Sequence, residues 1–387
     1  MKDIAILTKY YKNYNYGGIL QGYALYKTII GLGKTCDIIS YDAKKNPNPV
    51  YSSIMQQCKQ YGISAAIKKT REKCIGKLKF IIKDTLNERI VLCDKFMKEA
   101  GADTELYEDS CLEKLNRRYV AFISGSDQVW NPNAVRNLYL QNFVSNDKRK
   151  IAYAASIGRS CFSNKEASIL IPYIERFDFL GVREYTAKSL LEEFINKDIK
   201  VVIDPTLLLT KEEWKSVAAT RQIEQKYALF YFFSDSYIIR KRLKNFCRKK
   251  QLAMVIIPYA KQEFNFGDGK GDCIQLKSVG PHEFISAIKY ADYVFTDSFH
   301  GAVFSIIHQK EFVVFDRNKM EHVSMNSRLY DLLALFNLSN RLISLDQISE
   351  MEKMAVIDYD NVNATLNRER KKSLDYLKNA IGIESND

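Results

Sequence analysis

The 387-residue sequence is poor in the residues that build metal centres and cross-links. It has four histidines, and its eight cysteines are scattered singly, with no C-x-x-C pair and no histidine at metal-ligand spacing. This distribution argues against a structural zinc site and against a disulfide framework. We therefore expect no metal and a reducing compartment, the cytoplasm.

Long apolar runs are also missing. The densest one, Tyr227–Phe233, is far shorter than the roughly 18 residues that a membrane-spanning helix needs. Met1 is followed by a charged pair and a short strand-like run, not by a basic segment with an apolar stretch behind it. We therefore expect no secretory signal and a soluble protein.

Negative charge is in deficit, because 58 Lys and Arg residues face 46 Asp and Glu residues, a formal net charge of +12. Such an excess suits nucleic acid, an anionic membrane or an anionic substrate. No nucleic-acid-binding module accompanies it, so we expect no nucleic-acid partner. The basic stretch Lys59–Lys83 interleaves Lys and Arg with apolar residues and could touch anionic lipid at the inner face of the cell membrane. The ordinary alternative is a solvated helix face.

Short β-rich runs alternate with amphipathic segments from end to end, which is typical of parallel sheets built from β-α-β units. Asp204–Pro205 ends a first series, because the residue before a proline avoids helical geometry and a capping box, Thr210 with Glu213, then opens a new helix. We predict an α/β fold with two Rossmann-like, doubly wound lobes facing a cleft. The expected parts are a lobe over 1–205 with a strand-free helical insertion at about 46–115, a lobe over 206–345, and a helical segment over 346–387 that packs back on the first lobe.

The sharpest local signal is Phe295–Gly301, where a predicted strand hands over to a predicted helix. Ligands of open α/β sheets bind outside the carboxyl ends of strands. A cap by Asp297 or Ser298 would leave His300 and Gly301 in the first helical turn, beside amide N–H groups that attract phosphate or carboxylate. His300 is thus a candidate proton donor toward a bound anion. The alternative is a histidine satisfied by a backbone carbonyl.

A second polar cluster follows the apolar strand 120–124. There the carboxylate of Asp127 could accept a proton from a sugar hydroxyl, with Ser126 and Gln128 as neighbouring polar groups, and the face of Trp130 could stack on a pyranose. The alternative is a turn with a capping aspartate and a core tryptophan.

A glycine pair joins the first predicted strand to its helix. Gly17 and Gly18 would let a substrate approach the backbone closely, with Asn15 and Gln21 as hydrogen-bonding groups. The glycine spacing is wrong for a dinucleotide fingerprint, so we do not expect NAD.

Two arginines, Arg183 at a strand end and Arg328 at a helix start, are candidate anion ligands. A guanidinium binds carboxylate or phosphate through two parallel hydrogen bonds. Either could equally be the partner of an ordinary ion pair.

Six segments, in this order along most of the chain, resemble the polysaccharide pyruvyl transferase family: Asn15–Gln21, Ser124–Pro132, Ala152–Gly158, Val182–Glu184, Ile203–Thr206 and Thr296–Gly301. The resemblance implies a glycosyltransferase-B-like fold, phosphoenolpyruvate as donor, no metal or other cofactor, and an acceptor sugar on a glycan or lipid-linked oligosaccharide. It also implies surface-polysaccharide biosynthesis. Some relatives carry an arginine shortly before the histidine, where this chain has Asp297–Phe299.

The chemistry that the resemblance implies is the transfer of a pyruvyl group onto two sugar hydroxyls to form a cyclic ketal. His300 would protonate the donor and Asp127 would act as base. Arg183, Arg328, Ser298 and Gly301 would bind the donor, and the acceptor would meet the residues around the glycine pair and around Gln128. Two alternatives stay open: a nucleotide-sugar-dependent glycosyltransferase, and a non-catalytic glycan- or membrane-binding protein.

Overall fold

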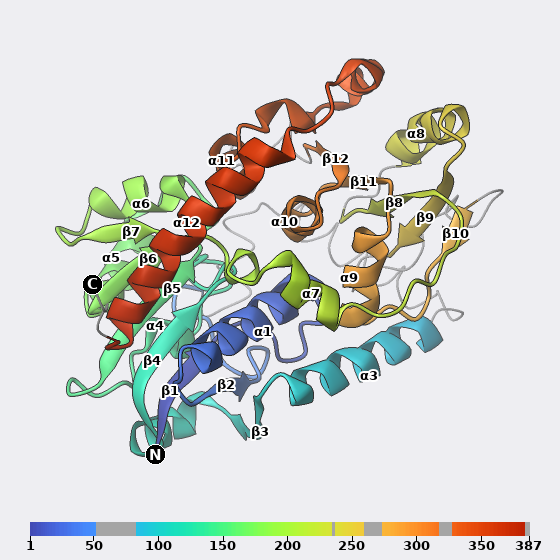
Figure 1. Cartoon of the computed structure of the whole chain (residues 1–387). Helices are drawn as coiled ribbons and strands as arrows, with labels where there is room; N and C mark the ends of the chain where they lie inside the picture. Colours follow the sequence, from blue (N-terminus) through green and yellow to red (C-terminus); the bar gives the residue numbers. More distant parts are fainter. Residues whose placement is uncertain (52–82, 234–236, 259–272, 317–326, 384–387) are drawn as a thin grey trace.

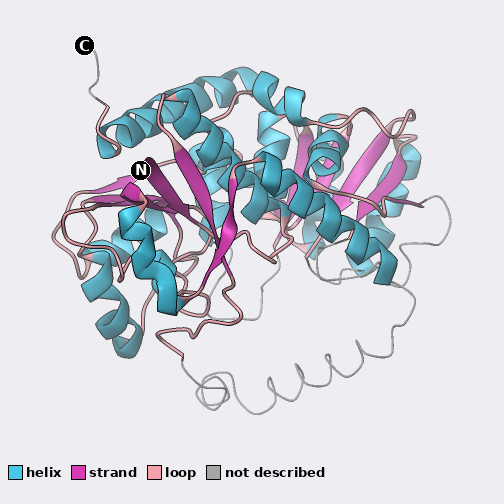
Figure 2. Cartoon of the chain, turned by 90° about the horizontal axis from the view of Figure 1, so that it is seen from below, coloured by secondary structure: helices cyan, strands magenta, loops and turns pink. Residues whose placement is uncertain are grey.

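The chain folds into two α/β lobes, each a parallel sheet with helices packed on it (Figures 1 and 2). The computed structural model describes residues 1–51, 83–233, 237–258, 273–316 and 327–383. The basic stretch Lys59–Lys83 ends at the first residue of a described helix and otherwise lies outside these ranges.

The first sheet has seven strands in the order β3-β2-β1-β4-β5-β6-β7, and all its pairings are parallel. Its strands are β1 (Lys2–Leu7), β2 (Cys36–Tyr41), β3 (Ala102–Tyr107), β4 (Tyr119–Gly125), β5 (Arg149–Ala155), β6 (Phe179–Val182) and β7 (Ile199–Val201). The interior strand β1 is buried on both faces over Ile4–Leu7, as expected of a parallel sheet covered by helices on both sides.

The second sheet repeats the plan with six strands in the order β10-β9-β8-β11-β12-β13, again all parallel. Its strands are β8 (Tyr227–Tyr231), β9 (Ala253–Ile257), β10 (Cys273–Gln275), β11 (Tyr293–Thr296), β12 (Glu311–Phe315) and β13 (Leu342–Ile343). In both sheets the first strand of the series lies inside, and the strand order reverses beside it. The predicted fold of two doubly wound lobes is confirmed.

The helices join these strands and cover the two sheets. The α-helices are α1 (Tyr16–Gly31), α3 (Lys83–Glu99), α4 (Asn137–Leu140), α5 (Asn164–Ile174), α6 (Tyr185–Glu192), α7 (Lys211–Val217), α8 (Tyr237–Lys249), α9 (Pro281–Lys289), α10 (Phe299–Ile307), α11 (Ser327–Leu335) and α12 (Tyr359–Ala380). Short 3-10 helices are η1 (Asp109–Arg117), η2 (Pro205–Leu207), η3 (Ser339–Arg341) and η4 (Leu345–Lys353).

The expectation of a strand-free insertion over about 46–115 is wrong at one point, because β3 lies within it. Among the described strands, this edge strand pairs only with β2. Its residues do not alternate between a buried apolar face and an exposed polar face, since Asp103, Thr104 and Glu105 are all partly or fully exposed. An edge strand needs no second buried face, so hydrophobic periodicity does not reveal it.

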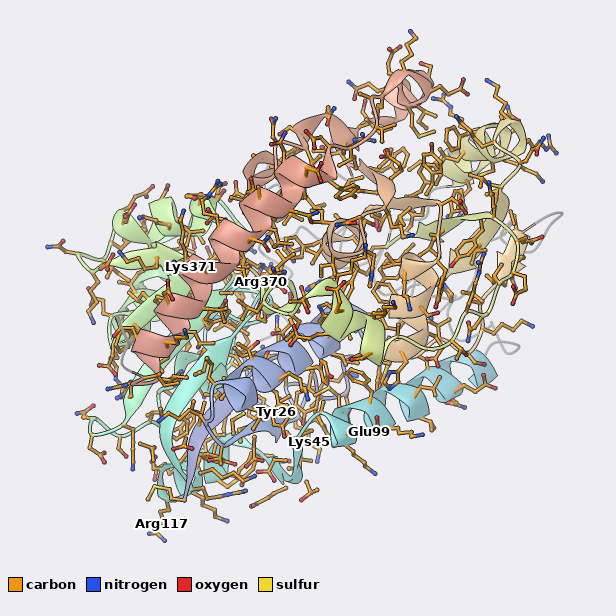
Figure 3. All side chains as sticks on the ribbon, viewed as in Figure 1. Tyr26, Lys45, Glu99, Arg117, Arg370 and Lys371 are labelled. Atoms are coloured by element: carbon orange, nitrogen blue, oxygen red, sulfur yellow. The ribbon has the colours of Figure 1, made fainter. Side chains whose placement is uncertain are left out.

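Two helices hold the lobes together. From α1, the hydroxyl of Tyr16 donates to the carbonyl oxygen of Val279 at 2.8 Å, and its ring stacks on Phe284 at 4.4 Å. The C-terminal helix α12 crosses back over the first lobe, where the hydroxyl of Tyr376 donates to the carbonyl oxygen of Ala152 at 2.8 Å. Farther along α12, the side chain of Arg370 donates to the carbonyl oxygen of Leu207 at 2.9 Å (Figure 3). A single hydrophobic cluster therefore runs through both lobes.

No helix in the described part of the chain is both long enough and apolar enough to cross a lipid bilayer.

Candidate functional site

A cavity of about 570 Å³ lies between the lobes, at the carboxyl ends of the strands. In open α/β sheets the loops part where the strand order reverses, which leaves a crevice for a ligand. Here β1 and β4 flank that point in the first sheet, and β8 and β11 flank it in the second. The loops after all four strands contribute to the cavity wall, among them Lys9, Asp127, Phe233 and Ser298. The cavity thus lies where the reversal points of both sheets face each other.

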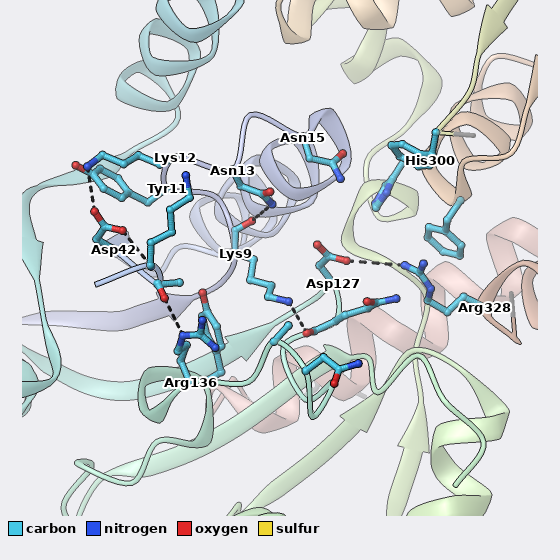
Figure 4. A pocket seen from close by; sticks show the side chains of 18 of the residues that line it. Lys9, Tyr11, Lys12, Asn13, Asn15, Asp42, Asp127, Arg136, His300 and Arg328 are labelled. Carbon is cyan, nitrogen blue, oxygen red and sulfur yellow. Dashed lines mark hydrogen bonds and ion pairs between the residues drawn. The ribbon is translucent and has the colours of Figure 1, made fainter. Parts of the chain in front are cut away.

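The second lobe presents its polar groups from one short strand-to-helix junction. The hydroxyl of Thr296 donates to the carbonyl oxygen of Tyr231 at 2.6 Å and accepts the N–H of Ser298 at 3.0 Å, so the ends of β8 and β11 are tied together. Ser298 caps α10, since its hydroxyl oxygen accepts the N–H of Gly301 at 3.3 Å. His300 follows in the first turn and lines the cavity with a side chain that is 9% exposed (Figure 4).

The imidazole of His300 is held between the two lobes. A Cβ atom placed on Gly17 of α1 would lie 2.0 Å from Nδ1 of His300, so only glycine leaves room for the ring there. On the other side the ring of Phe299 meets it edge-on, with ring centroids 5.1 Å apart. Gly17 therefore makes room for a side chain of the second lobe, and the predicted approach of a substrate to its backbone stays a prediction.

A buried charge network lies behind His300, centred on Asp204, which follows β7. Oδ2 of Asp204 accepts the hydroxyl of Ser126 and the guanidinium of Arg183, both at 2.8 Å, and lies 3.6 Å from Nε2 of His300. Burial alone would raise the pKa of Asp204, but the neighbouring charges of His300 and Arg183 outweigh it and hold this pKa far below its ordinary value. Asp204 is thus an ionised carboxylate with no exposure to solvent.

Asp127 lies at the middle of the cavity in a left-handed backbone conformation, with φ at 67°. That conformation is more accessible to Asp and Asn than to most residues, and it turns the carboxyl group into the cavity. Oδ1 of Asp127 lies 3.9 Å from Nη1 of Arg328 (Figure 4). Burial would raise the pKa of Asp127, but the charges of Lys9, Arg183, Arg328 and His300 together lower it. The carboxylate is therefore ionised at neutral pH.

The far end of the cavity belongs to the first lobe alone. There Nζ of Lys12 pairs with Asp42 at 3.0 Å, and Nε of Arg136 donates to the carbonyl oxygen of Ala43 at 2.8 Å (Figure 4). Nζ of Lys9 donates to the carbonyl oxygen of Gln128 at 2.8 Å. Five Lys and Arg side chains but only two carboxylates line the whole cavity. The electrostatic balance suits an anionic ligand.

The structure brings together six of the residues predicted from sequence. The cavity is lined by Asn15, Asp127, Gln128, Ser298, His300 and Arg328. They come from both lobes, so residues up to about three hundred positions apart share one wall.

Trp130 requires a correction. Its side chain is fully buried, with Nε1 donating to the carbonyl oxygen of Tyr139 at 3.3 Å and the ring packed edge-on against Phe177. No face of the indole is open to a sugar, so the predicted stacking role is wrong. Ser126 is equally buried and serves Asp204.

Three predicted residues in the first turns of α1, next to the loop that joins it to β1, support the cavity without lining it. The side chain of Gln21 is buried and donates to the hydroxyl of Thr8 and to the carbonyl oxygen of Gly18 at 2.6 and 2.8 Å, so it shapes the loop. Gly18 passes close to the backbone of Lys9, where a Cβ atom would lie 2.6 Å from the carbonyl oxygen. Gly17 makes room for His300, as described above.

The two remaining donor-binding predictions also fall outside the cavity wall. Arg183 is buried against Asp204, and the ring of Phe299 covers its guanidinium at 4.4 Å. A Cβ atom on Gly301 would lie 2.4 Å from the hydroxyl of Thr296, so this glycine allows α10 to pack on β11.

Sequence reasoning missed Asp204 as a site residue, and also the cations Lys9, Lys12 and Arg136. Asp204 stands before Pro205, where the sequence pattern predicts a lobe boundary and not a site residue. The cations were hidden among many surface lysines and arginines, and only the loops after β1 and β4 bring them together. Among the described residues, no three His, Cys, Asp or Glu side chains gather in a way that could hold a metal ion.

Comparisons with known proteins agree with this architecture. A family model described as polysaccharide pyruvyl transferase matches residues 15–319. Among curated proteins, no sequence matches significantly.

Similar solved structures include the MnaA–UDP complex of S. aureus, with a TM-score of 0.56 and 11% identity over 100% of this chain and 98% of that one. The UDP-GlcNAc 2-epimerase of Neisseria meningitidis bound to UDP-GlcNAc has a TM-score of 0.52 and 10% identity, over 98% and 100%. A putative UDP-N-acetylglucosamine 2-epimerase of Listeria monocytogenes has a TM-score of 0.51 and 9% identity, over 98% and 91%. At such identities the likeness concerns the fold, two Rossmann-like lobes of the glycosyltransferase-B kind.

Proposed function

The chain belongs to the polysaccharide pyruvyl transferase family, and from this premise we propose that it moves the pyruvyl group of phosphoenolpyruvate onto two hydroxyls of a glycan sugar. The observation that carries the proposal is the cavity between the lobes, where His300, Arg328 and Asp127 meet. A histidine can deliver a proton, a guanidinium can neutralise an anionic donor, and a carboxylate can accept the proton of a sugar hydroxyl.

The reaction balances without a cofactor. A proton added to the methylene carbon of phosphoenolpyruvate leaves the neighbouring carbon electrophilic. One sugar hydroxyl attacks that carbon and loses its proton, the C–O bond to phosphate breaks, and the second hydroxyl closes the ketal and loses its own proton. Of the two protons released, one replaces the proton spent on the methylene carbon and the other leaves with phosphate. No metal is needed for any of these steps.

The donor fits the end of the cavity that the second lobe builds. His300 and Ser298 sit there at the N-terminus of α10, where backbone N–H groups favour an anion. Arg328 reaches the same place from α11, its guanidinium 5.8 Å from the ring of Phe299. The departing phosphate and the donor carboxylate would be stabilised by these groups. Protonation of the donor falls to His300, because the other groups at this end are hydroxyls or a permanently charged guanidinium.

The acceptor fits the broader end that the first lobe builds. Asn15 and Gln128 are amide side chains suited to sugar hydroxyls, and Asn133 and Tyr11 extend the same wall. Asp127 lies between the two ends, within reach of both substrates. Its lowered pKa makes it a weak base, so its role is to orient the attacking hydroxyl and to accept its proton as the bond to the donor forms.

A nucleotide-sugar donor is the competing proposal, because two of the similar structures are bound to UDP or UDP-GlcNAc. The experiment that decides is a parallel incubation of the protein with phosphoenolpyruvate or UDP-sugars and a panel of free and lipid-linked glycosides. We expect inorganic phosphate and a glycoside heavier by one pyruvate less one water with phosphoenolpyruvate alone. Release of UDP with a glycosylated product would support the competing donor instead, and binding of glycosides without turnover would support a non-catalytic role.

The same panel bears on where the protein works. We propose that the acceptor is carried on a polysaccharide precursor, so turnover of lipid-linked glycosides in preference to free ones would place the enzyme beside the membrane. The stretch Lys59–Lys83 is the segment to delete in that comparison.

A further inference from the structure

We propose that Asp204 is a positioning residue for His300, forming a carboxylate–imidazole pair across the joint between the lobes. The proposal rests on the proposed function, in which His300 is the proton donor. It assigns a purpose to the buried charge network behind His300, which the proposed reaction steps do not use.

The two residues come from different lobes, and the carboxylate of Asp204 faces the imidazole of His300. Asp204 caps the N-terminus of η2 in the first lobe, and His300 lies in the first turn of α10 in the second. Oδ2 of Asp204 and Nε2 of His300 are 3.6 Å apart, and both side chains are withdrawn from solvent, with exposures of 0% and 9%. Within the described residues Nε2 has no hydrogen-bond partner, so the carboxylate is the group that it faces.

The carboxylate is fixed in place by bonds that leave one direction open. Oδ1 of Asp204 accepts the N–H and the hydroxyl of Thr206 at 3.0 and 2.7 Å. Oδ2 accepts Ser126 and Arg183. Four donors therefore hold one buried anion, and the remaining approach to Oδ2 points at the imidazole. Groups that orient a catalytic side chain are held in this way in preorganised sites.

The network also assigns the two ring nitrogens of His300. With Nε2 turned to Asp204, Nδ1 is the atom left to exchange a proton with the substrate, and it lies over the bare backbone of Gly17. A partner bonded to one ring nitrogen sets which nitrogen carries the exchangeable proton. The separation of 3.6 Å exceeds an ordinary hydrogen bond, and such contacts in ligand-free enzymes commonly shorten when substrate binds.

The remaining charges around His300 are Asp127, Arg328 and Lys9 along the cavity and Arg183 behind Asp204. Three of these four are cations, which oppose a protonated imidazole. The carboxylate of Asp204, 3.6 Å from Nε2 of His300, offsets them. Removal of the negative charge of Asp204 should therefore destabilise the protonated form of His300.

The test compares Asp204→Asn with Ser126→Ala, which removes one hydrogen bond to Asp204 but keeps its charge. We expect the alkaline limb of the pH–rate profile of pyruvyl transfer to move about one pH unit or more toward acid in Asp204→Asn, the scale on which an adjacent opposite charge acts. In Ser126→Ala this limb should fall at the wild-type pH, whatever the rate of the variant, because the charge of Asp204 is kept. A profile that is the same in wild type and Asp204→Asn, or that shifts equally in both variants, overturns the proposal.

A second measurement needs no substrate and separates this proposal from the proposed function. The chain has four histidines, so the ring nitrogens of His300 can be followed by ¹⁵N NMR, assigned by their loss in His300→Gln. We expect the wild-type ring to carry its proton on Nε2 when neutral, and to lose its second proton at a lower pH in Asp204→Asn. A neutral wild-type ring with its proton on Nδ1 overturns the pairing even if Asp204→Asn fails to fold. A confirmed pairing in a protein that transfers no pyruvyl group would refute only the proposed function.

Discussion

The two lobes share one topology but contribute unequally to the cavity. Both sheets run outward from an internal first strand and reverse beside it, so each offers one crevice. Most of the lining residues come from the first lobe, on loops after β1, β2 and β4. The second lobe supplies a few residues from the junction of β11 with α10, with Arg328 and Phe233 beside them. The first lobe therefore forms a broad polar surface, while the second lobe contributes one helix end that carries the proposed proton donor.

The division of roles between the two lobes depends most strongly on His300. If the second lobe supplies the proton donor, His300→Gln should lower kcat by about 10²- to 10⁴-fold, the usual contribution of a positioned general acid. The matched control is His282→Gln on α9 of the same lobe, whose side chain is 40% exposed, and this variant should keep the wild-type rate. Steady-state kinetics with circular dichroism as a check of folding measures both. Equal rates in the two variants would remove His300 from the chemistry.

A methyl group on α1 probes the contact between the lobes. In Gly17→Ala the new Cβ would lie 2.0 Å from Nδ1 of His300, so the ring must move. A displacement of about 1 Å can cost roughly 10²-fold in rate. Gly31→Ala is the control on the same helix, since a Cβ there meets nothing within 4 Å. We expect kcat to fall in the first variant only, and a normal rate in Gly17→Ala would show that the ring position is not critical.

Asp127 tests the contribution of the first lobe. Asp127→Asn keeps the size and the hydrogen-bonding shape but removes the charge, and because its pKa is already low we expect a loss in kcat of about tenfold rather than the larger loss at His300. Substrate titration should show donor binding nearly unchanged. An unaltered kcat with normal binding would remove Asp127 from the transfer of the hydroxyl proton.

A second histidine, His308, caps the C-terminus of α10 and contrasts with His300 at the other end of that helix. Burial, helped by Lys310 and Lys211, lowers the pKa of His308 to about 3. Between its ordinary value near 6.5 and that pKa, the unfolded chain binds a proton that the folded chain does not. Stability therefore falls as the pH falls, by about 1.4 kcal/mol per pH unit. Urea unfolding from about pH 7 to pH 4 should show a shallower dependence in His308→Gln than in wild type, and identical slopes would contradict this.

Much of the fold can be predicted from sequence because buried parallel strands consist of nearly continuous runs of apolar residues. Phe179–Val182 and Tyr293–Thr296 coincide with strands of the structure. The edge strand β3 was missed since its exposed residues carry no such run. Of the site, His300 and Asp127 could be predicted because each lies within four residues of the carboxyl end of a strand.

What sequence could not supply is which neighbour a polar residue meets. Ser126 and Trp130 stand one and three residues from Asp127 yet turn into the core, because successive residues after a strand point in different directions. Asp204 lies 96 positions before His300 in the printed sequence and meets it only through the packing of the lobes. Hydrophobic periodicity indicates which residues are buried, but it does not indicate which residues meet across a cleft.

The most direct test of the central claim is to run the reaction in D₂O and inspect the new methyl group by NMR and mass spectrometry. If His300 protonates the methylene carbon of phosphoenolpyruvate, the ketal formed by the wild-type protein should carry one deuterium on that methyl group, and His300→Gln should form almost none of the product. A product without deuterium on that carbon, or one formed as fast by His300→Gln as by wild type, would contradict the account.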